Sequence, residues 1–271
     1  MKTVKIPAWY YQQFDADLNA DVPGSGYGGW KKESLDFNPE KSALVIMHAW
    51  DCGTPEEYPG WFRSVEYLLR ANRILKDVFP GLLGAVRASG MRIYHVVSSA
   101  GFYKELPGYK ETLELTGAAG TRPEQVERDD VLNRLNRFRT ENSFPGTHNQ
   151  PDISAGFRNL DFPPEAAPAE GENIAENADQ LFTLCKRDGI NHLVYAGFAV
   201  NWCLLMSSGG MLDMSRRGVM CSTIREAVTA VENRESAVDE AHKEEALWRV
   251  SIMFGFVYDI DDFITAAGQF T

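Results

Sequence analysis

Short apolar runs alternate with amphipathic segments along most of this chain, and that alternation is the feature that most limits its fold. The apolar runs predict strands at residues 43–47, 91–97, 192–197, 219–223 and 254–258. Between them, helices are expected over 64–89 with a break near Pro80, and over 177–188, 203–217 and 236–253. Alternating strands and helices predict right-handed βαβ units. We therefore expect residues 42–271 to form a three-layer α/β/α, doubly wound fold around a mainly parallel sheet of about six strands.

Two stretches lack this alternation. Residues 1–41 scatter aromatic side chains among Asp, Gly and Pro, which predicts an irregular extension that packs on its own domain or on a neighbouring subunit. Residues 100–175 are rich in proline and predict an irregular insertion, with a short helix or strand at 130–139 and a polar tract at 148–172.

Composition narrows the class of protein. With 271 residues and a formal net charge of −11, the chain is not expected to bind nucleic acid or an anionic membrane surface. The N-terminus lacks the apolar core of a signal peptide, and no apolar run reaches the length of a membrane span, so we expect a cytoplasmic protein. The four cysteines are scattered without a Cys-x-x-Cys pair, which predicts reduced thiols and neither disulfides nor a structural zinc site.

One of those cysteines stands where a thiol can become a nucleophile. Cys203 follows the strand predicted at 192–197 and opens a predicted helix, with Asn201 as the candidate N-cap. The free amides and the helix dipole at such a position favour the thiolate, and the same amides can bind an oxyanion. The alternative is that Cys203 is a small buried hydrophobic residue, as many free cysteines are.

A histidine is expected on the same edge of the sheet. His48 ends the strand predicted at 43–47, and ligands of parallel sheets bind where the strands end. If the two strands are neighbours, His48 and Cys203 face one crevice as a nucleophile and its base. Asp51 either orients the imidazole or caps a local turn.

Residues 193–203, with the sequence LVYAGFAVNWC, resemble the nucleophile segment of the isochorismatase-like cysteine hydrolases, a family that includes nicotinamidases and N-carbamoylsarcosine amidase. Residues 181–190, 226–227 and 254–257 also follow the register of that family. The resemblance implies a Rossmann-like α/β hydrolase domain with Cys203 as nucleophile and a cis peptide near Phe198-Ala199. It also implies an oxyanion hole formed by the amides of Ala199 and Cys203, and a dimer or tetramer.

The chain departs from the family pattern at the other catalytic positions. His48 stands where the family has an aspartate, and no lysine matches the family lysine, for which Arg137 or Arg139 is the candidate substitute. The Asp-x-His metal motif of nicotinamidases is missing too, because residues 101–103 read Gly-Phe-Tyr. We therefore expect neither a metal nor another cofactor.

These observations leave more than one function open. In the first, Cys203 and His48 hydrolyse a small amide or related C–N bond of a small-molecule substrate, which Trp50, Asp51, Trp202 and Glu141 help to bind. Trp50, Trp61 and Trp202 either line the pocket or belong to the core. In the second, the site is inactive and the domain binds a ligand or a partner, because one fold serves many functions. A third, metal-assisted hydrolysis through His48, Asp51, Cys52 and His95, fits the residue types but matches no zinc spacing.

Overall fold

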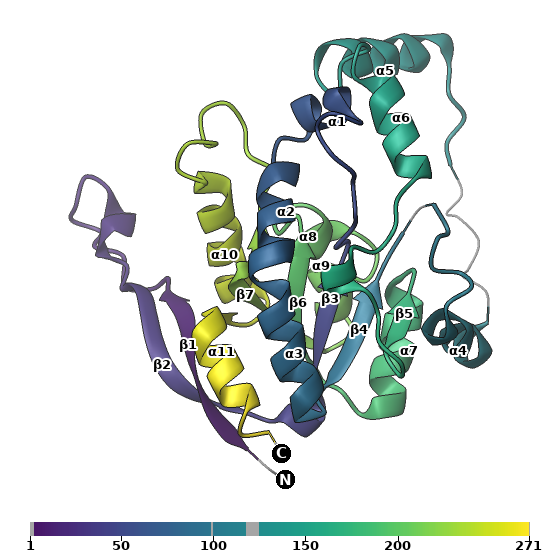
Figure 1. Ribbon diagram of the computed structural model, residues 1–271. Coiled ribbons are helices and arrows are strands. Elements are labelled where there is room, and N and C mark those ends of the chain that lie inside the picture. Colours follow the sequence, from purple (N-terminus) through teal and green to yellow (C-terminus); the bar gives the residue numbers. More distant parts are fainter. Residues whose placement is uncertain (1–2, 99, 118–124, 271) are drawn as a thin grey trace.

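The computed structural model describes residues 3–98, 100–117 and 125–270, and its centre is one eight-stranded sheet (Figure 1). The strands run in the order β2-β1-β8-β7-β6-β3-β4-β5. Their bounds are β1 (Val4–Gln12), β2 (Gly29–Phe37), β3 (Ser42–Met47), β4 (Arg92–Val96), β5 (Asn173–Ala175), β6 (His192–Phe198), β7 (Met220–Thr229) and β8 (Val257–Tyr258). Strands β3 to β8 pair in parallel, while β1 pairs antiparallel with β2 and β8. The predicted mainly parallel, doubly wound α/β fold is confirmed, with two more strands than expected.

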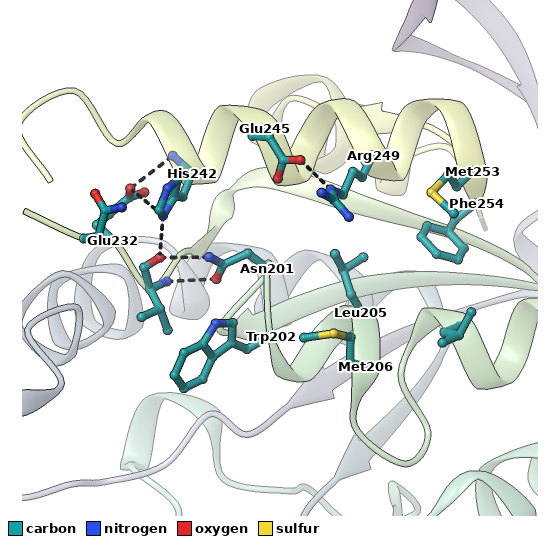
Figure 2. Close-up of a pocket in the computed structure, with 13 residues that line it drawn as sticks. Asn201, Trp202, Leu205, Met206, Glu232, His242, Glu245, Arg249, Met253 and Phe254 are labelled. Atoms are coloured by element: carbon teal, nitrogen blue, oxygen red, sulfur yellow. Dashed lines mark hydrogen bonds and ion pairs between the residues drawn. The ribbon is translucent and has the colours of Figure 1, made fainter. Parts of the chain in front are cut away.

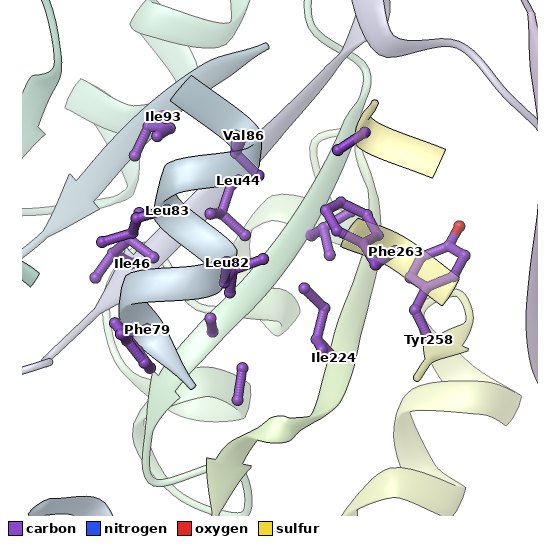
Figure 3. Packing of buried hydrophobic residues seen from close by; sticks show 14 of the residues in the cluster. Leu44, Ile46, Phe79, Leu82, Leu83, Val86, Ile93, Ile224, Tyr258 and Phe263 are labelled. Carbon is purple, nitrogen blue, oxygen red and sulfur yellow. The ribbon is translucent and has the colours of Figure 1, made fainter. Parts of the chain in front are cut away.

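Helices cover both faces of the sheet because the central strand is apolar on both. All six residues of β3 are buried. Leu44 and Ile46 pack in the cluster under α2 (Leu68–Asp77), α3 (Phe79–Ser89) and α11 (Ile260–Ala267), part of which Figure 3 shows. The alternate residues of β3 face the cluster formed with α7 (Ala178–Asp188), α8 (Cys203–Met206), α9 (Met211–Ser215) and α10 (Ala241–Met253). A strand buried on both faces is typical of a parallel sheet between two helical layers.

The break predicted near Pro80 is confirmed, since α2 ends at Asp77 and α3 begins at Phe79. The single helix expected over 203–217 is wrong. Gly209 has a φ of +83°, a conformation that favours glycine, and this turn separates α8 from α9. The hydroxyl of Tyr195 donates to the carbonyl of Gly209 at 2.8 Å and fixes the turn on the sheet.

The N-terminal segment is not the irregular extension that the sequence suggested. β1 and β2 form a hairpin, and the one-residue bridge of Trp9 to Val257 joins it to the edge of the parallel sheet. Val4, Ile6 and Ala8 are buried on alternate positions of β1, so the segment has the period of a strand with one face on the core. Scattered aromatic residues hid that short alternation.

The short helix or strand expected at 130–139 is confirmed as a helix. The expectation that the rest of the region at 100–175 is irregular is wrong. It contains α4 (Pro107–Thr116), α5 (Asp130–Asn142), α6 (Gln150–Arg158) and β5. Pro107 and Pro151 occupy the first turn of α4 and α6, where proline needs no hydrogen-bond partner and starts a helix. Figure 1 shows α5 and α6 grouped with α1 (Pro59–Ser64) at one end of the sheet, and we call α1 and α6 the cap.

Three short 3-10 turns complete the described elements: Pro23–Gly26, Pro39–Lys41 and Pro164–Ala166. Within the described ranges, no helix has both the length and the apolar character that crossing a membrane requires.

Candidate active site

The sheet brings His48 and Cys203 to one cavity. Strands β3 and β6 are parallel neighbours, and Met47 pairs with Gly197 near their carboxyl ends. His48 follows β3 directly and Cys203 follows β6 after a short turn, so both side chains line a cavity of about 460 Å³. We call it the catalytic cavity.

A glycine allows the two strands to approach so closely here. Gly197 has a φ of +123°, and a Cβ on it would lie 1.9 Å from the carbonyl oxygen of Met47. No other residue fits without separating β3 from β6.

Cys203 is the first residue of α8 and is partly buried. The prediction that Asn201 caps this helix is wrong. Its side-chain amide donates to the carbonyl of Val231 at 2.8 Å and its oxygen accepts from the amide of Val231 at 2.9 Å. Trp202 occupies the cap position without a side-chain cap bond. Because α8 has only four residues, its dipole is small, and what it offers the site is its free amides.

Two backbone amides, one before α8 and one at its first residue, are available to an oxyanion. The peptide bond between Phe198 and Ala199 is cis, as the resemblance implies. Within the described ranges, the amides of Ala199 and Cys203 donate to no protein acceptor, whereas the next amide, that of Leu204, donates to the carbonyl of Ala199 at 3.1 Å. An amide pair beside a nucleophile is the arrangement that stabilises a tetrahedral oxyanion.

His48 is buried, with 6% of its surface exposed. Its Nε2 lies 3.2 Å from the hydroxyl oxygen of Ser98, and its ring stacks on Trp50 with the centroids 4.5 Å apart. Its Nδ1 is buried and has no partner among the described residues. Burial lowers the pKa of His48 to about 4, so the imidazole is neutral near pH 7 and can accept a proton.

No hydrogen bond joins the His48 ring to the Cys203 sulfur among the described contacts. The shared cavity is the observation that relates the two groups. Hydrogen bonds between a nucleophile and its base are often long in unliganded sites and shorten when substrate binds.

Aromatic side chains form most of the cavity wall. Trp50 and Trp202, which the sequence proposed for substrate contact, both line it. The other aromatic lining residues are Trp61, Tyr67, Phe144, Phe157 and Phe198. Trp61 and Phe157 come from the two cap helices and stack with their centroids 5.0 Å apart. The cap therefore closes the cavity above the ends of the strands.

Other proposed residues lie outside the cavity. The Asp51 carboxylate accepts the amide of Gly53 at 2.9 Å, so it holds a local turn and does not orient His48. Arg137, Arg139 and Glu141 lie on α5 with exposed side chains and are not among the lining residues. The structure therefore does not bring the candidate substitutes for the family lysine to Cys203.

The proposed metal ligands are dispersed as well. Cys52 lines the catalytic cavity, where burial, aided by the charge of Asp51, raises the pKa of its thiol to about 12. His95 is fully buried elsewhere, with its Nε2 2.8 Å from a carboxylate oxygen of Glu172. In the parts of the chain that the structure describes, no group of three His, Cys, Asp or Glu side chains is placed to hold a metal ion.

Sequence reasoning missed several lining residues. Ser98 could have been predicted from the rule that ligands bind where parallel strands end, because it follows β4, the other neighbour of β3. Tyr67 directly precedes α2, and Phe144 and Phe157 belong to the region expected to be irregular, so no local pattern tied them to the site.

A second cavity, of about 560 Å³, lies between α8 and α10 (Figure 2). Trp202 lines both cavities, but Cys203 and His48 line only the first. The carboxylates that line the second cavity already have partners. Glu232 accepts the backbone amides of His242 and Lys243 near the start of α10, and Glu245 forms an ion pair with Arg249. We therefore place the candidate chemistry in the catalytic cavity.

No protein-family model and no curated protein matches the chain. Several solved structures resemble it. A cysteine hydrolase from Pseudomonas syringae pv. phaseolicola is 13% identical, with a TM-score of 0.49 over 87% of this chain and 96% of that one. An isochorismatase-like hydrolase from Alkaliphilus metalliredigens is 17% identical, with a TM-score of 0.49 over 84% and 99%. N-carbamoylsarcosine amidase from Thermoplasma acidophilum is 14% identical, with a TM-score of 0.40 over 82% and 97%.

Proposed function

We propose that the chain is a cysteine-dependent hydrolase of a small amide or a related C–N bond. Cys203 is the nucleophile and His48 accepts its proton. The observation that carries the proposal is the cavity that both residues line. The amides of Ala199 and Cys203, which precede and begin α8, have no acceptor among the described residues.

The reaction follows from these positions. The thiol of Cys203 transfers its proton to His48 while the sulfur attacks the carbonyl carbon, and the amides of Ala199 and Cys203 bind the developing oxyanion. The C–N bond then breaks as the imidazolium gives its proton to the leaving amine. Water attacks the thioester with its proton passing to His48, and the acid and the free thiol are released.

The low pKa of His48 determines when the proton moves. A buried neutral imidazole is a weak base toward a thiol, so a stable thiolate–imidazolium pair is not expected in the empty cavity. The developing oxyanion and its amide donors make the transfer favourable during attack. We therefore expect the proton to move in the same step in which the C–S bond forms.

Rapid acid quenching followed by mass spectrometry tests the proposal. During turnover of an amide, Cys203 should carry the acyl group, with the added mass of the substrate less its amine. Cys203→Ser and His48→Asn should each lower kcat by about a hundred-fold or more, since each removes a partner of the proton transfer. Hydrolysis at the original rate in Cys203→Ser, or an acyl group on another residue, would show that sulfur is not the nucleophile.

The second candidate is a ligand-binding module without turnover. It is favoured by one observation: among the described lining residues, no charged side chain replaces the aspartate and lysine of the family that the sequence resembles. Binding of amides without release of amine would support it.

A further inference from the structure

The catalytic cavity is large for a small amide. A protein cavity of about 150 Å³ accommodates one benzene ring. At about 460 Å³, this cavity has roughly three times that volume. A single-ring substrate would leave much of it unfilled.

Its wall favours a flat hydrophobic ligand. The ring of His48 stacks on Trp50, whose ring meets Phe157 edge to face at 6.1 Å between centroids. Phe157 in turn stacks on Trp61, so aromatic rings continue from the catalytic imidazole to the cap. Packed rings of this kind present fixed apolar faces, against which another ring stacks.

The described residues of the cavity wall offer no counter-ion to a charged group. None of the described lining residues is Asp, Glu, Lys or Arg. His48, the one histidine among the described lining residues, is neutral at pH 7 because burial lowers its pKa to about 4. A carboxylate or an ammonium group would lose its water here without gaining a counter-ion, which strongly disfavours binding.

One side-chain donor of a residue that lines the cavity lacks a partner. The indole nitrogen of Trp50 is buried and donates to no described residue. Indole N–H is a donor only, and buried donors are normally paired. A ligand with an acceptor atom against Trp50 would satisfy it.

We propose that the substrate is an uncharged amide with a hydrophobic body of about two fused rings, which packs against the stacked pair of Trp61 and Phe157, and with a ring acceptor for the Trp50 indole. That the ligand is an amide rests on the proposed function. The size, charge and acceptor requirements rest on the cavity alone.

Binding to Cys203→Ala, followed by tryptophan fluorescence, tests the ligand class without turnover. The probes are benzamide, 2-naphthamide, and 2-naphthamides with a carboxylate or an aminomethyl group on the far ring. We expect 2-naphthamide to bind about ten-fold or more tighter than benzamide, because it buries more apolar surface. The charged analogues should bind about a hundred-fold or more weaker than 2-naphthamide. Equal or tighter binding of a charged analogue, or no binding of any probe, overturns the inference.

Quinolinecarboxamides that differ in the position of the ring nitrogen test the acceptor. One isomer should bind Cys203→Ala about ten-fold more tightly than 2-naphthamide does, the effect of one buried hydrogen bond. Trp50→Phe keeps the ring and removes the donor, so it should erase that advantage. Trp248→Phe is the matched control, because Trp248 lies on α10 and its indole donates to Gln13 outside the cavity. If no isomer exceeds 2-naphthamide, or Trp50→Phe leaves the advantage intact, the acceptor assignment is wrong.

The outcomes separate the two proposals. Selective binding of neutral two-ring amides without release of amine contradicts the hydrolase and leaves the ligand class standing. Hydrolysis that prefers charged or single-ring amides supports the hydrolase and contradicts the proposed ligand class.

Discussion

At the scale of the residue, His48 links the proposed chemistry to stability. Its pKa is lowered by burial to about 4, whereas a histidine in an unfolded chain titrates near 6.5. Between these values the unfolded chain binds more protons, so this residue makes the fold less stable as pH falls through that window. The difference amounts to about 3 kcal/mol between pH 7 and pH 4.

His48→Asn should remove that part of the pH dependence. Asparagine tolerates the φ of +51° at this position better than most residues do. Urea unfolding at pH 7, 6, 5 and 4 measures the effect as the difference in slope between the parent and the variant. His148→Asn, which replaces an exposed histidine, should keep the parental slope. Parallel slopes for the parent and His48→Asn would mean that the imidazole is not buried in the neutral form.

The site could be predicted from sequence only where a general rule connects distant residues. Strand ends of a parallel sheet meet at one edge, and that rule put His48 and Cys203 on the same crevice, where both now line the cavity. No such rule predicts the position of Arg139, because that position depends on how α5 packs relative to the sheet. Asn201 had the right residue type for a cap, but its pairing with Val231 is a contact between segments far apart in sequence.

At the scale of the element, the cap depends on two close helix contacts. The amide of Gly60 in α1 donates to the carboxylate of Asp152 in α6 at 2.6 Å. A Cβ on Gly156 would lie 2.1 Å from the Trp61 ring, so α6 can approach α1 only with glycine there. These contacts hold Trp61 and Phe157 in the cavity wall.

Gly156→Ala should therefore displace Trp61 or separate the cap helices. We expect a loss of about 1–3 kcal/mol in the free energy of unfolding, as for other overpacked sites. A higher KM is expected for any substrate that contacts the wall. Urea unfolding and near-UV circular dichroism of the tryptophans provide the measurements.

Gly84→Ala is the matched control, because Gly84 lies in α3 and a Cβ there would have no atom within 4 Å. It should be neutral or stabilise the fold by up to about 1 kcal/mol. If both substitutions behave alike, the close packing of α6 on α1 does not exist in solution.

Elements with long, uniform patterns were predicted best. The strand at 43–47 and the helix at 177–188 have apolar positions that suit one structure only, and both are present as β3 and α7. The cap helix α6 was missed because proline usually interrupts regular structure, although Pro151 stands in the first turn of this helix. Whether a proline starts or ends a helix depends on the residues after it, and α6 is stabilised mainly by contacts with α1.

At the scale of the whole molecule, the two chain ends are joined through the sheet edge. Lys32 of β2 forms ion pairs with Asp259, which precedes α11, and with Asp262, which lies in α11. The indole of Trp9 donates to the carboxylate of Asp259 at 2.8 Å. The sequence could not show this contact between the chain ends. A hairpin with a single apolar face is recognised only when the strand that it pairs with is known. β8 supplies that partner more than 200 residues later.

The centre of this junction is Phe37, the last residue of β2, which is 2% exposed. Its ring stacks on Phe270 at 5.4 Å between centroids and meets Phe263 and Tyr258 edge to face. Phe37→Ala should lower the free energy of unfolding by about 3–5 kcal/mol, because it leaves a cavity among packed rings. Lys5→Ala on the same hairpin should cost less than about 1 kcal/mol, since its pair with Asp36 is exposed. Urea unfolding measures both; a small loss for Phe37→Ala would show that the hairpin rests on the sheet without supporting it.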